Sequence, residues 1–250
     1  MAKISLHGFN NLTKSLSFSL YKLHYLKNNQ AHNDYNAYNA YNAYISKHFC
    51  ADNLTILLTK ICHAIGGNVL NVATQDYDPQ GASATLMISE EAQPESLVAH
   101  LDKSHLCIHT YPDDNPCNNI AIFRADIELS TCGVISPLKV INYLIAEFDA
   151  DVVDIDYRIR GMTRNAVGEK LFNVDSINNL SDFLSPKISD NFYIRENSFS
   201  KQNLYHAKLS KKEIDISKYL VQTGSSDLTD EKYLSASVQL KEEIEQLFNN

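Results

Sequence analysis

The segment Ser15-Leu16-Ser17-Phe18-Ser19-Leu20 alternates serine with a large apolar residue at every step. A period of two residues is typical of a β-strand that buries one side and leaves the other side polar. The same period returns in the segment Val152–Arg160, where the side chains on one side are Val153, Ile155, Tyr157 and Ile159. The two segments together predict a sheet with one apolar face, which other elements must cover.

Further strands are expected on either side of these two segments in the chain. Short apolar and β-branched runs predict strands at residues 3–9, 69–77, 84–88, 97–101, 105–111 and 120–129. A turn at Pro79-Gln80-Gly81 joins the second and third of these runs. Most of the connections are short, which favours a mainly antiparallel arrangement.

Helices are expected between the strands. Asp52 or Asn53 can cap a helix that Gly66-Gly67 ends, and its apolar stripe is Leu54, Leu57, Leu58, Ile61 and Ile65. Pro137 opens a second helix over residues 137–148, because proline is tolerated in a first helical turn. Two more helices are expected near residues 175–184 and 230–248. The predicted fold class is therefore an α+β sandwich, with helices packed on a mainly antiparallel sheet.

The chain is expected to form a single domain over residues 1–250, with residues 161–250 as a C-terminal extension whose pattern is less regular. Asn-Ala-Tyr recurs at Asn36, Asn39 and Asn42, a period of three that fits neither a sheet nor a helical stripe. We interpret this repeat as a surface insertion of low complexity.

Composition restricts the class of protein. The formal net charge of −8 argues against a nucleic-acid binder, which usually presents a basic surface. No apolar run is long enough for a transmembrane helix, and residues 1–9 lack the pattern of a secretory signal. The five cysteines contain no CxxC pair, as is typical of free thiols in a reducing cytosol. We therefore expect a cytoplasmic protein that binds neither nucleic acid nor membrane.

Reactive side chains are densest in His100-Leu101-Asp102-Lys103-Ser104-His105-Leu106-Cys107-Ile108-His109, and Ser130-Thr131-Cys132-Gly133 follows. Residue types alone leave three interpretations open. The first is a serine hydrolase that uses Ser104, a histidine and Asp102, although no G-x-S-x-G surrounds Ser104. The second is a zinc site, whose ligands would come from His100, His105, Cys107, His109, Cys117 and Cys132. The third is a strand that carries histidines and cysteines without chemistry.

Several longer motifs carry a family resemblance. They are His7-Gly8-Phe9-Asn10-Asn11-Leu12, Gln75-Asp76-Tyr77-Asp78-Pro79-Gln80-Gly81-Ala82-Ser83, the stretch 100–112, and Phe123-Arg124-Ala125-Asp126-Ile127-Glu128 with Ser130-Thr131-Cys132-Gly133. In this order they resemble the bacterial S-adenosylmethionine decarboxylase proenzymes of the longer-chain subgroup. The resemblance runs from about residue 4 to 164, and more faintly to the end.

The resemblance implies that the chain cuts its own peptide bond between Lys103 and Ser104. Ser104 would attack the preceding carbonyl, His109 would act as the base of this processing, and a pyruvoyl group would remain on the new N-terminus at residue 104. Residues 1–103 would become the β chain and residues 104–250 the α chain. The pyruvoyl group would form a Schiff base with the substrate and accept electrons as pyridoxal phosphate does.

The resemblance also implies the rest of the function. The substrate would be S-adenosylmethionine, Cys132 would donate the proton after loss of CO₂, and the product would serve spermidine biosynthesis. The cleaved chains would associate into a higher oligomer, with Mg²⁺ as an activator, although the sequence shows no dedicated magnesium motif. An alternative is an unprocessed, catalytically silent member of the family that acts as a binding or regulatory partner.

Two features of the sequence stand against a simple transfer of these roles. In a regular strand Ser104 and His109 point to opposite faces, because their separation of five residues is odd. Asp113 stands where the family pattern has a glutamate after Tyr-Pro. The shorter carboxylate predicts a weaker contact at that position.

Overall fold

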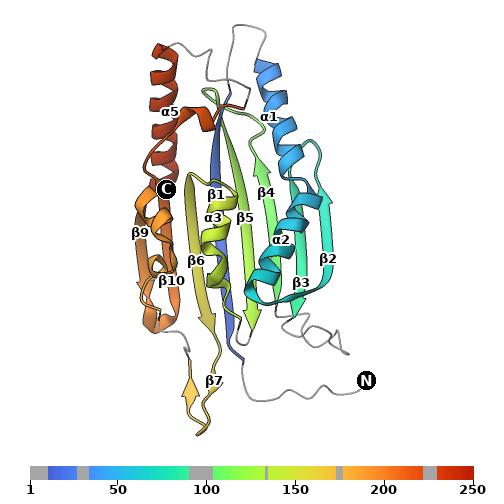
Figure 1. The fold of residues 1–250 in the computed structure, drawn as a ribbon, viewed down its shortest axis with the longest axis vertical. Helices are drawn as coiled ribbons and strands as arrows, with labels where there is room; N and C mark the ends of the chain where they lie inside the picture. Colours follow the sequence, from blue (N-terminus) through green and yellow to red (C-terminus); the bar gives the residue numbers. More distant parts are fainter. Residues whose placement is uncertain (1–10, 27–33, 90–103, 133–134, 173–176, 222–229) are drawn as a thin grey trace.

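The computed structural model describes residues 11–26, 34–89, 104–132, 135–172, 177–221 and 230–250 (Figure 1). Its main feature is one eight-stranded sheet in the order β2-β3-β4-β5-β1-β6-β10-β9, in which every pair of neighbours is antiparallel. The strands are β1 (Thr13–Tyr25), β2 (Asn68–Asp76), β3 (Ala82–Ser89), β4 (His105–Pro112), β5 (Ile120–Cys132), β6 (Val152–Arg160), β9 (Phe192–Phe199) and β10 (Leu204–Lys211). Short strands β7 (Thr163–Arg164) and β8 (Lys170–Leu171) pair outside it. The predicted α+β fold class is confirmed.

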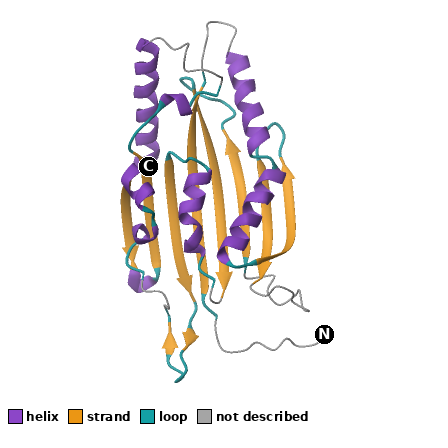
Figure 2. Ribbon diagram, in the orientation of Figure 1, coloured by secondary structure: helices purple, strands orange, loops and turns teal. Residues whose placement is uncertain are grey.

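The alternating segment of the sequence forms the centre of the sheet. β1 lies between β5 and β6, and its residues Leu16, Phe18 and Leu20 are buried while the serines between them are partly exposed. Alternation carries this division across the paired strands, so one face of the sheet is mainly apolar. The helices α1 to α4 lie over this face (Figure 2). We call the opposite face, which carries the serines of β1, the second face.

Helix α2 (Ala51–Ile65) follows the sequence prediction with one correction. Its apolar stripe, from Leu54 to Ile65, is buried against β3, and Gly66 ends it at φ +93°. The predicted cap is wrong: the Ala51 amide donates to the Asp76 carboxylate at the end of β2, 2.8 Å away. The cap comes from a neighbouring strand, which sequence spacing along the helix cannot show.

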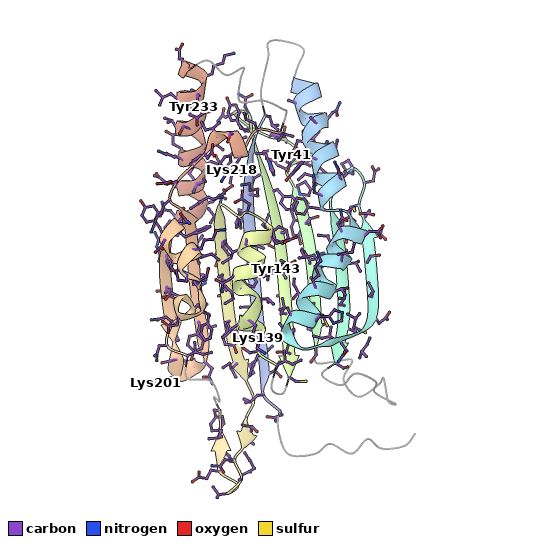
Figure 3. The ribbon with its side chains drawn as sticks, in the orientation of Figure 1. Tyr41, Lys139, Tyr143, Lys201, Lys218 and Tyr233 are labelled. Carbon is purple, nitrogen blue, oxygen red and sulfur yellow. The ribbon has the colours of Figure 1, made fainter. Side chains whose placement is uncertain are left out.

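The Asn-Ala-Tyr repeat is not a surface insertion. It lies in helix α1 (Asp34–His48), and Tyr41 is completely buried between this helix and the sheet (Figure 3). Tyr38, Tyr41 and Tyr44 are three residues apart, which places them on neighbouring positions of one helical side. The three-residue period is misleading because the buried side chains of α1 are Ala37, Tyr41 and Ile45, four residues apart, whereas Tyr44 is exposed.

Several elements differ from expectation, most of them after Gly161. The predicted helix at 137–148 begins as a 3₁₀ turn (Pro137–Val140) and continues as α3 (Ile141–Glu147). Residues 180–183 form another 3₁₀ turn instead of a helix, and α4 (Pro186–Asn191), β9 and β10 were not predicted. The expected strands at residues 3–9 and 97–101 lie outside the described residues.

Helix α5 (Asp230–Asn249) is confirmed, and it covers part of the second face. Its buried residues Ala236, Leu240 and Ile244 join a small core with strand residues, namely Leu23, Tyr25, Ile120 and Val152. Alternation puts these strand residues on the second face, at the Tyr25 end of β1. None of the helices in the described part of the chain is both long and apolar enough to span a bilayer.

Candidate active site

Ser104 and Cys132 meet at the Thr13 end of the sheet. Ser104 directly precedes β4, Cys132 ends β5, and the Ser104 Oγ lies 3.3 Å from the Cys132 Sγ. The Cys132 amide also donates to the same oxygen over 3.3 Å. Ser104 is only 4% exposed, whereas Cys132 is partly exposed. Within the described part of the chain, the serine hydroxyl therefore has one thiol and one backbone N–H as polar neighbours, and it lies in a largely water-excluded position.

Backbone contacts hold this pair in place. The Ile88 amide of β3 donates to the Ser104 carbonyl over 3.2 Å, and Cys132 pairs in register with Thr13 of β1. Beside it, the buried Thr131 hydroxyl donates to the Ile135 carbonyl, 3.2 Å away. Three strands and the turn after β5 thus fix the positions of the hydroxyl and the thiol. The two residues are 28 positions apart in the chain, and they meet because β4 and β5 are antiparallel neighbours.

His109 does not join this pair within one chain. It lies in the middle of β4, opposite Asp126 of β5, and its side chain is exposed on the second face. Five residues of strand separate it from Ser104, which is about 17 Å at about 3.3 Å per residue. The odd spacing noted in the sequence therefore persists, and no bulge is present between β4 and either of its neighbours. The role of His109 in processing stays a prediction.

The other chemical interpretations find less support. His105, Cys107 and His109 share the second face, but they lie in a row along β4 and do not converge. Cys117 is exposed in the turn before β5. Burial raises the pKa of the Cys107 thiol, which disfavours a thiolate ligand. Lys103, Asp102 and His100 lie outside the described residues. The structure therefore does not place Asp102 for the hydrolase hypothesis or His100 for the zinc hypothesis.

The Gln75–Ser83 motif packs against and hydrogen-bonds to β4, the strand that carries His109, and to the turn after it. Gly81, at φ +98°, passes so close to the Thr110 carbonyl that a Cβ would lie 3.1 Å from it. The Thr110 hydroxyl accepts from the Ala82 amide at 2.7 Å, and the Gln80 side chain donates to the Asp113 carbonyl at 3.1 Å. The Asp113 carboxylate accepts from the Asn115 and Ile122 amides, so it stabilises its own turn. This motif is structural in the isolated chain.

A hollow of about 290 Å³ opens on the second face beside the serine–cysteine pair. Cys132 lies on the same face of β5 as Ser130 and Glu128, which line the hollow, because the three alternate. β6 contributes three charged residues, and the lining includes Ser15, Ser17, His105, Asp156, Arg158 and Arg160. Sequence reasoning named Glu128 without a role and did not identify the residues of β6. Their signal was the run of charges that alternates with the apolar side of that strand.

Fold and site define an α+β protein with a helix-covered antiparallel sheet and a serine–cysteine pair at one strand end. A model of the S-adenosylmethionine decarboxylase family matches residues 36–161, half of the chain. The chain belongs to this family and is therefore an enzyme.

Curated relatives match almost the full length. The S-adenosylmethionine decarboxylase proenzyme of Photorhabdus laumondii is 43% identical over 99% of this chain and 97% of that protein. The proenzyme of the same name from Pseudoalteromonas translucida is also 43% identical, over 98% of this chain and 94% of that protein. An adenosylmethionine decarboxylase structure from Aquifex aeolicus is 13% identical with a TM-score of 0.37, over 67% of this chain and 98% of the other. That likeness carries no argument about the site.

Proposed function

We propose that this chain cuts itself between Lys103 and Ser104 and then decarboxylates S-adenosylmethionine, using the pyruvoyl group that the cut leaves. The observation that supports this most is the 3.3 Å contact between the Ser104 Oγ and the Cys132 Sγ. It brings the residue that would become the cofactor to the residue that would donate a proton in catalysis. The proposal also draws on the printed name of the curated relatives, which are proenzymes.

The processing step starts at the Ser104 hydroxyl. Its oxygen attacks the Lys103 carbonyl carbon, the C–N bond breaks, and the serine nitrogen takes up a proton, so the amide becomes an ester. The Cys132 amide, which donates to this oxygen, would stabilise the charge that develops as the hydroxyl loses its proton. Removal of the Ser104 α-proton by a base then expels the residue 1–103 chain as a carboxylate. Hydrolysis of the dehydroalanine that remains releases ammonia and leaves the ketone.

In catalysis the pyruvoyl group would supply the electron sink that no amino-acid side chain offers. The protein's own residues bind the substrate, exclude water and move the proton. The Cys132 thiol touches the position of Ser104 and is partly exposed toward the second face, so it can deliver its proton to the substrate carbon. Because Ser104 is almost completely buried, water has little access to this position. The thiol can therefore protonate the substrate carbon with little competition from water.

The hollow beside Cys132 is the place that we assign to the substrate. S-adenosylmethionine carries a sulfonium cation, and the carboxylates of Glu128 and Asp156 line this hollow. Ser15, Ser17 and Ser130 add hydroxyl groups that can bond to a ribose or an amino group. The hollow opens on the second face of the single chain, next to Cys132. The decarboxylated product would serve spermidine biosynthesis in the cytoplasm.

Self-association belongs to the same proposal. His109 and Ser104 lie on one sheet but about 17 Å apart along β4. A second copy, placed with its second face against this one, would bring the histidine of each chain to the Thr13 end of the other, where Cys132 lies on that face and contacts Ser104. The face carries charges of both signs, including Asp126, Glu128, Arg158 and Arg160, as a self-complementary two-fold interface needs. Activation by Mg²⁺ stays a prediction of the resemblance.

Intact mass of the purified chain tests the proposal. We expect two fragments that divide after residue 103, the larger beginning with a pyruvoyl group. Ser104→Ala should remain a single chain, while Ser17→Ala, a serine of β1 away from the junction, should be cut as in the wild type. A wild-type chain of full mass that still binds S-adenosylmethionine would favour the silent family member instead. Cleavage of Ser104→Ala at the same bond would exclude Ser104 as the nucleophile.

A further inference from the structure

Two aspartates and a histidine converge on the second face, where β6 pairs with β10. The His206 Nδ1 lies 3.1 Å from the Asp156 Oδ1 and 3.4 Å from the Asp154 Oδ1. One ligand atom from each residue falls within 4.8 Å of the other two. Among the residues that the structure describes, this is the single group of metal-ligating side chains that comes together. The three side chains point the same way because Asp154, Asp156 and His206 all alternate with buried residues of their strands.

One oxygen of this group lacks a hydrogen bond. The Asp154 Oδ1 is inaccessible to solvent, and no donor in the described structure has the geometry to bond to it. Its 3.4 Å approach to the His206 ring is an ion-pair distance without hydrogen-bond alignment. A carboxylate oxygen that is shielded from water and has no donor costs free energy, although the Asp154 side chain as a whole is 30% exposed. The cost disappears if a cation occupies the space that the three ligand atoms share.

We propose that Asp154, Asp156 and His206 bind a divalent transition-metal ion of the Mn²⁺ to Zn²⁺ series. An imidazole nitrogen with two carboxylate oxygens suits these ions, whereas Mg²⁺ prefers an all-oxygen shell with several waters. Two carboxylates would balance the charge of one such dication. The donor chemistry of this group therefore selects a different metal from the magnesium that the family resemblance implies.

The side chains around Asp154, Asp156 and His206 are compatible with a bound metal ion. On β10, the Lys208 Nζ lies 3.7 Å from the Asp154 Oδ2, beyond hydrogen-bond distance, and supplies a positive charge when no metal is bound. Across the sheet, Ser19 and Ser17 of β1 stand opposite Asp154 and Asp156. On the outer side, Asn197 of β9 pairs with His206. Open positions in the metal's coordination shell would be completed by water or by these neutral groups.

Occupation would cross-link β6 to β10 and would reach the substrate hollow through Asp156, which lines both. The inference stands on these contacts alone and is independent of whether the chain processes itself. A metal that binds only the folded chain stabilises it by mass action. The first consequence is therefore a metal-dependent melting temperature, which needs no enzymatic activity to be seen.

Binding of Mn²⁺ to the full-length protein after treatment with a chelator tests the proposal. We expect saturable binding of one ion per chain by calorimetry and by electron paramagnetic resonance, with a rise in melting temperature. Mg²⁺ should bind at least about tenfold more weakly. His206→Ala should weaken Mn²⁺ binding by more than about tenfold, since even the loss of an indirect partner costs that much. His63→Ala, an exposed histidine of α2, should bind as the wild type does.

Two further variants keep the test decisive. Asp156→Asn alters a side chain that is 60% exposed, so it should fold normally and still lose Mn²⁺ affinity. Lys208→Ala removes the competing cation and should tighten binding. If the wild type shows no saturable Mn²⁺ or Zn²⁺ binding, or if His206→Ala binds as tightly as His63→Ala, the proposal is wrong. Equal affinity for Mg²⁺ and Mn²⁺ would also overturn it, because the imidazole would then not be a ligand.

Discussion

At the scale of single residues, burial distinguishes a structural cysteine, Cys62, from a cysteine that can take part in catalysis, Cys132. Cys62 is fully buried in α2, and burial raises the pKa of its thiol to about 11, so it acts as a small apolar side chain. Cys132 is partly exposed and touches the residue from which the cofactor would form. Only the second environment allows a thiol to exchange a proton with a substrate.

We expect Cys132→Ala to leave self-cleavage intact and to lower decarboxylation by about 10²–10⁴-fold, the usual worth of a positioned proton donor. Release of CO₂ from S-adenosylmethionine and intact mass measure the two effects separately. Cys117→Ala, which removes an exposed thiol far from Ser104, is the matched control and should behave as the wild type. Full activity of Cys132→Ala would remove this thiol from the mechanism.

A glycine beside the same end of the sheet offers a sharp test of packing. Gly161 and Gly168 both have φ +87°, but a Cβ on Gly161 would overlap the Asn11 carbonyl, whereas a Cβ on Gly168 would meet nothing within 4 Å. The backbone conformation alone costs alanine about 1–3 kcal/mol at either position. We expect Gly161→Ala to lower the free energy of unfolding in urea by clearly more than Gly168→Ala. Equal losses would mean that the contact with Asn11 contributes nothing.

The residue roles that could be predicted from the sequence are those carried by one continuous segment or by the family resemblance. Ser104 and Cys132 were named on the resemblance, and the structure places them in contact. The group of Asp154, Asp156 and His206 was missed because its members come from strands about 50 residues apart. The spacing of Asp154 and Asp156 only indicates one side of a strand, and their histidine partner becomes visible once β10 is known.

At the scale of secondary-structure elements, predictability depended on how many residues repeat a pattern. The sequence predicts β1, with 13 residues, and α2, with a complete apolar stripe. β10 was missed although Tyr205, Ala207 and Leu209 alternate with polar residues, because the run is short and follows an irregular region. Helix α1 is not predicted for another reason: its three-residue repeat indicates low complexity, and its burial depends on the side chains that β1 places against it.

What β1 presents to α1 is His24. Its ring lies 5.4 Å from the Tyr41 ring and 5.3 Å from the Tyr44 ring, and its buried Nε2 has no hydrogen-bond partner among the residues that the structure describes. Burial, together with the nearby charge of Lys22, lowers the pKa of His24 to about 3. The folded chain therefore keeps this imidazole neutral at pH values where an unfolded chain, with a pKa near 6.5, takes up a proton.

This difference sets the direction of a pH effect. Between pH 6.5 and about 3 the unfolded chain binds one more proton than the folded chain, so stability falls as the pH falls, by at most about 1.4 kcal/mol per pH unit. We expect His24→Phe, which keeps the ring packing, to show a shallower loss between pH 6 and 4 in urea titrations. His63→Phe, at an exposed position of α2, should keep the wild-type slope. An unchanged slope in His24→Phe would show that His24 is already protonated in the folded chain.

At the scale of the whole molecule, the second face is covered at one end of the sheet and open at the other. At the Tyr25 end of β1, α5 covers the second face, and the fully buried Asp151 accepts from the Tyr219 hydroxyl at 2.7 Å and from the Leu23 amide at 2.9 Å. Hydrogen bonds from Lys211 and Lys22 outweigh burial and lower the pKa of nearby Asp149. This end is closed by packing and paired charges. At the Thr13 end, the second face carries the hollow and Cys132, which contacts the buried Ser104.

Because α5 covers the second face at the Tyr25 end, two copies can meet through this face at the Thr13 end. This arrangement gives a prediction about processing. If His109 acts on Ser104 of a second copy, two inactive chains can complement each other. Ser104→Ala keeps the histidine but has no nucleophile, and His109→Ala keeps the nucleophile but has no base. We expect each variant alone to remain uncut, whereas co-expression yields cleavage of the His109→Ala chain only, because its Ser104 meets the intact histidine of its partner.

Intact mass reads this result directly, since the two chains differ in mass and only one of them should divide after residue 103. Native mass spectrometry of the same sample shows whether mixed assemblies are present. Co-expression of Ser104→Ala with the wild type, in which the wild-type chain should be cut, controls for an assembly that blocks processing. If mixed assemblies form and neither variant chain is cut, His109 acts within its own chain, and β4 must then bend during processing to bring the imidazole across the roughly 17 Å that separates it from Ser104.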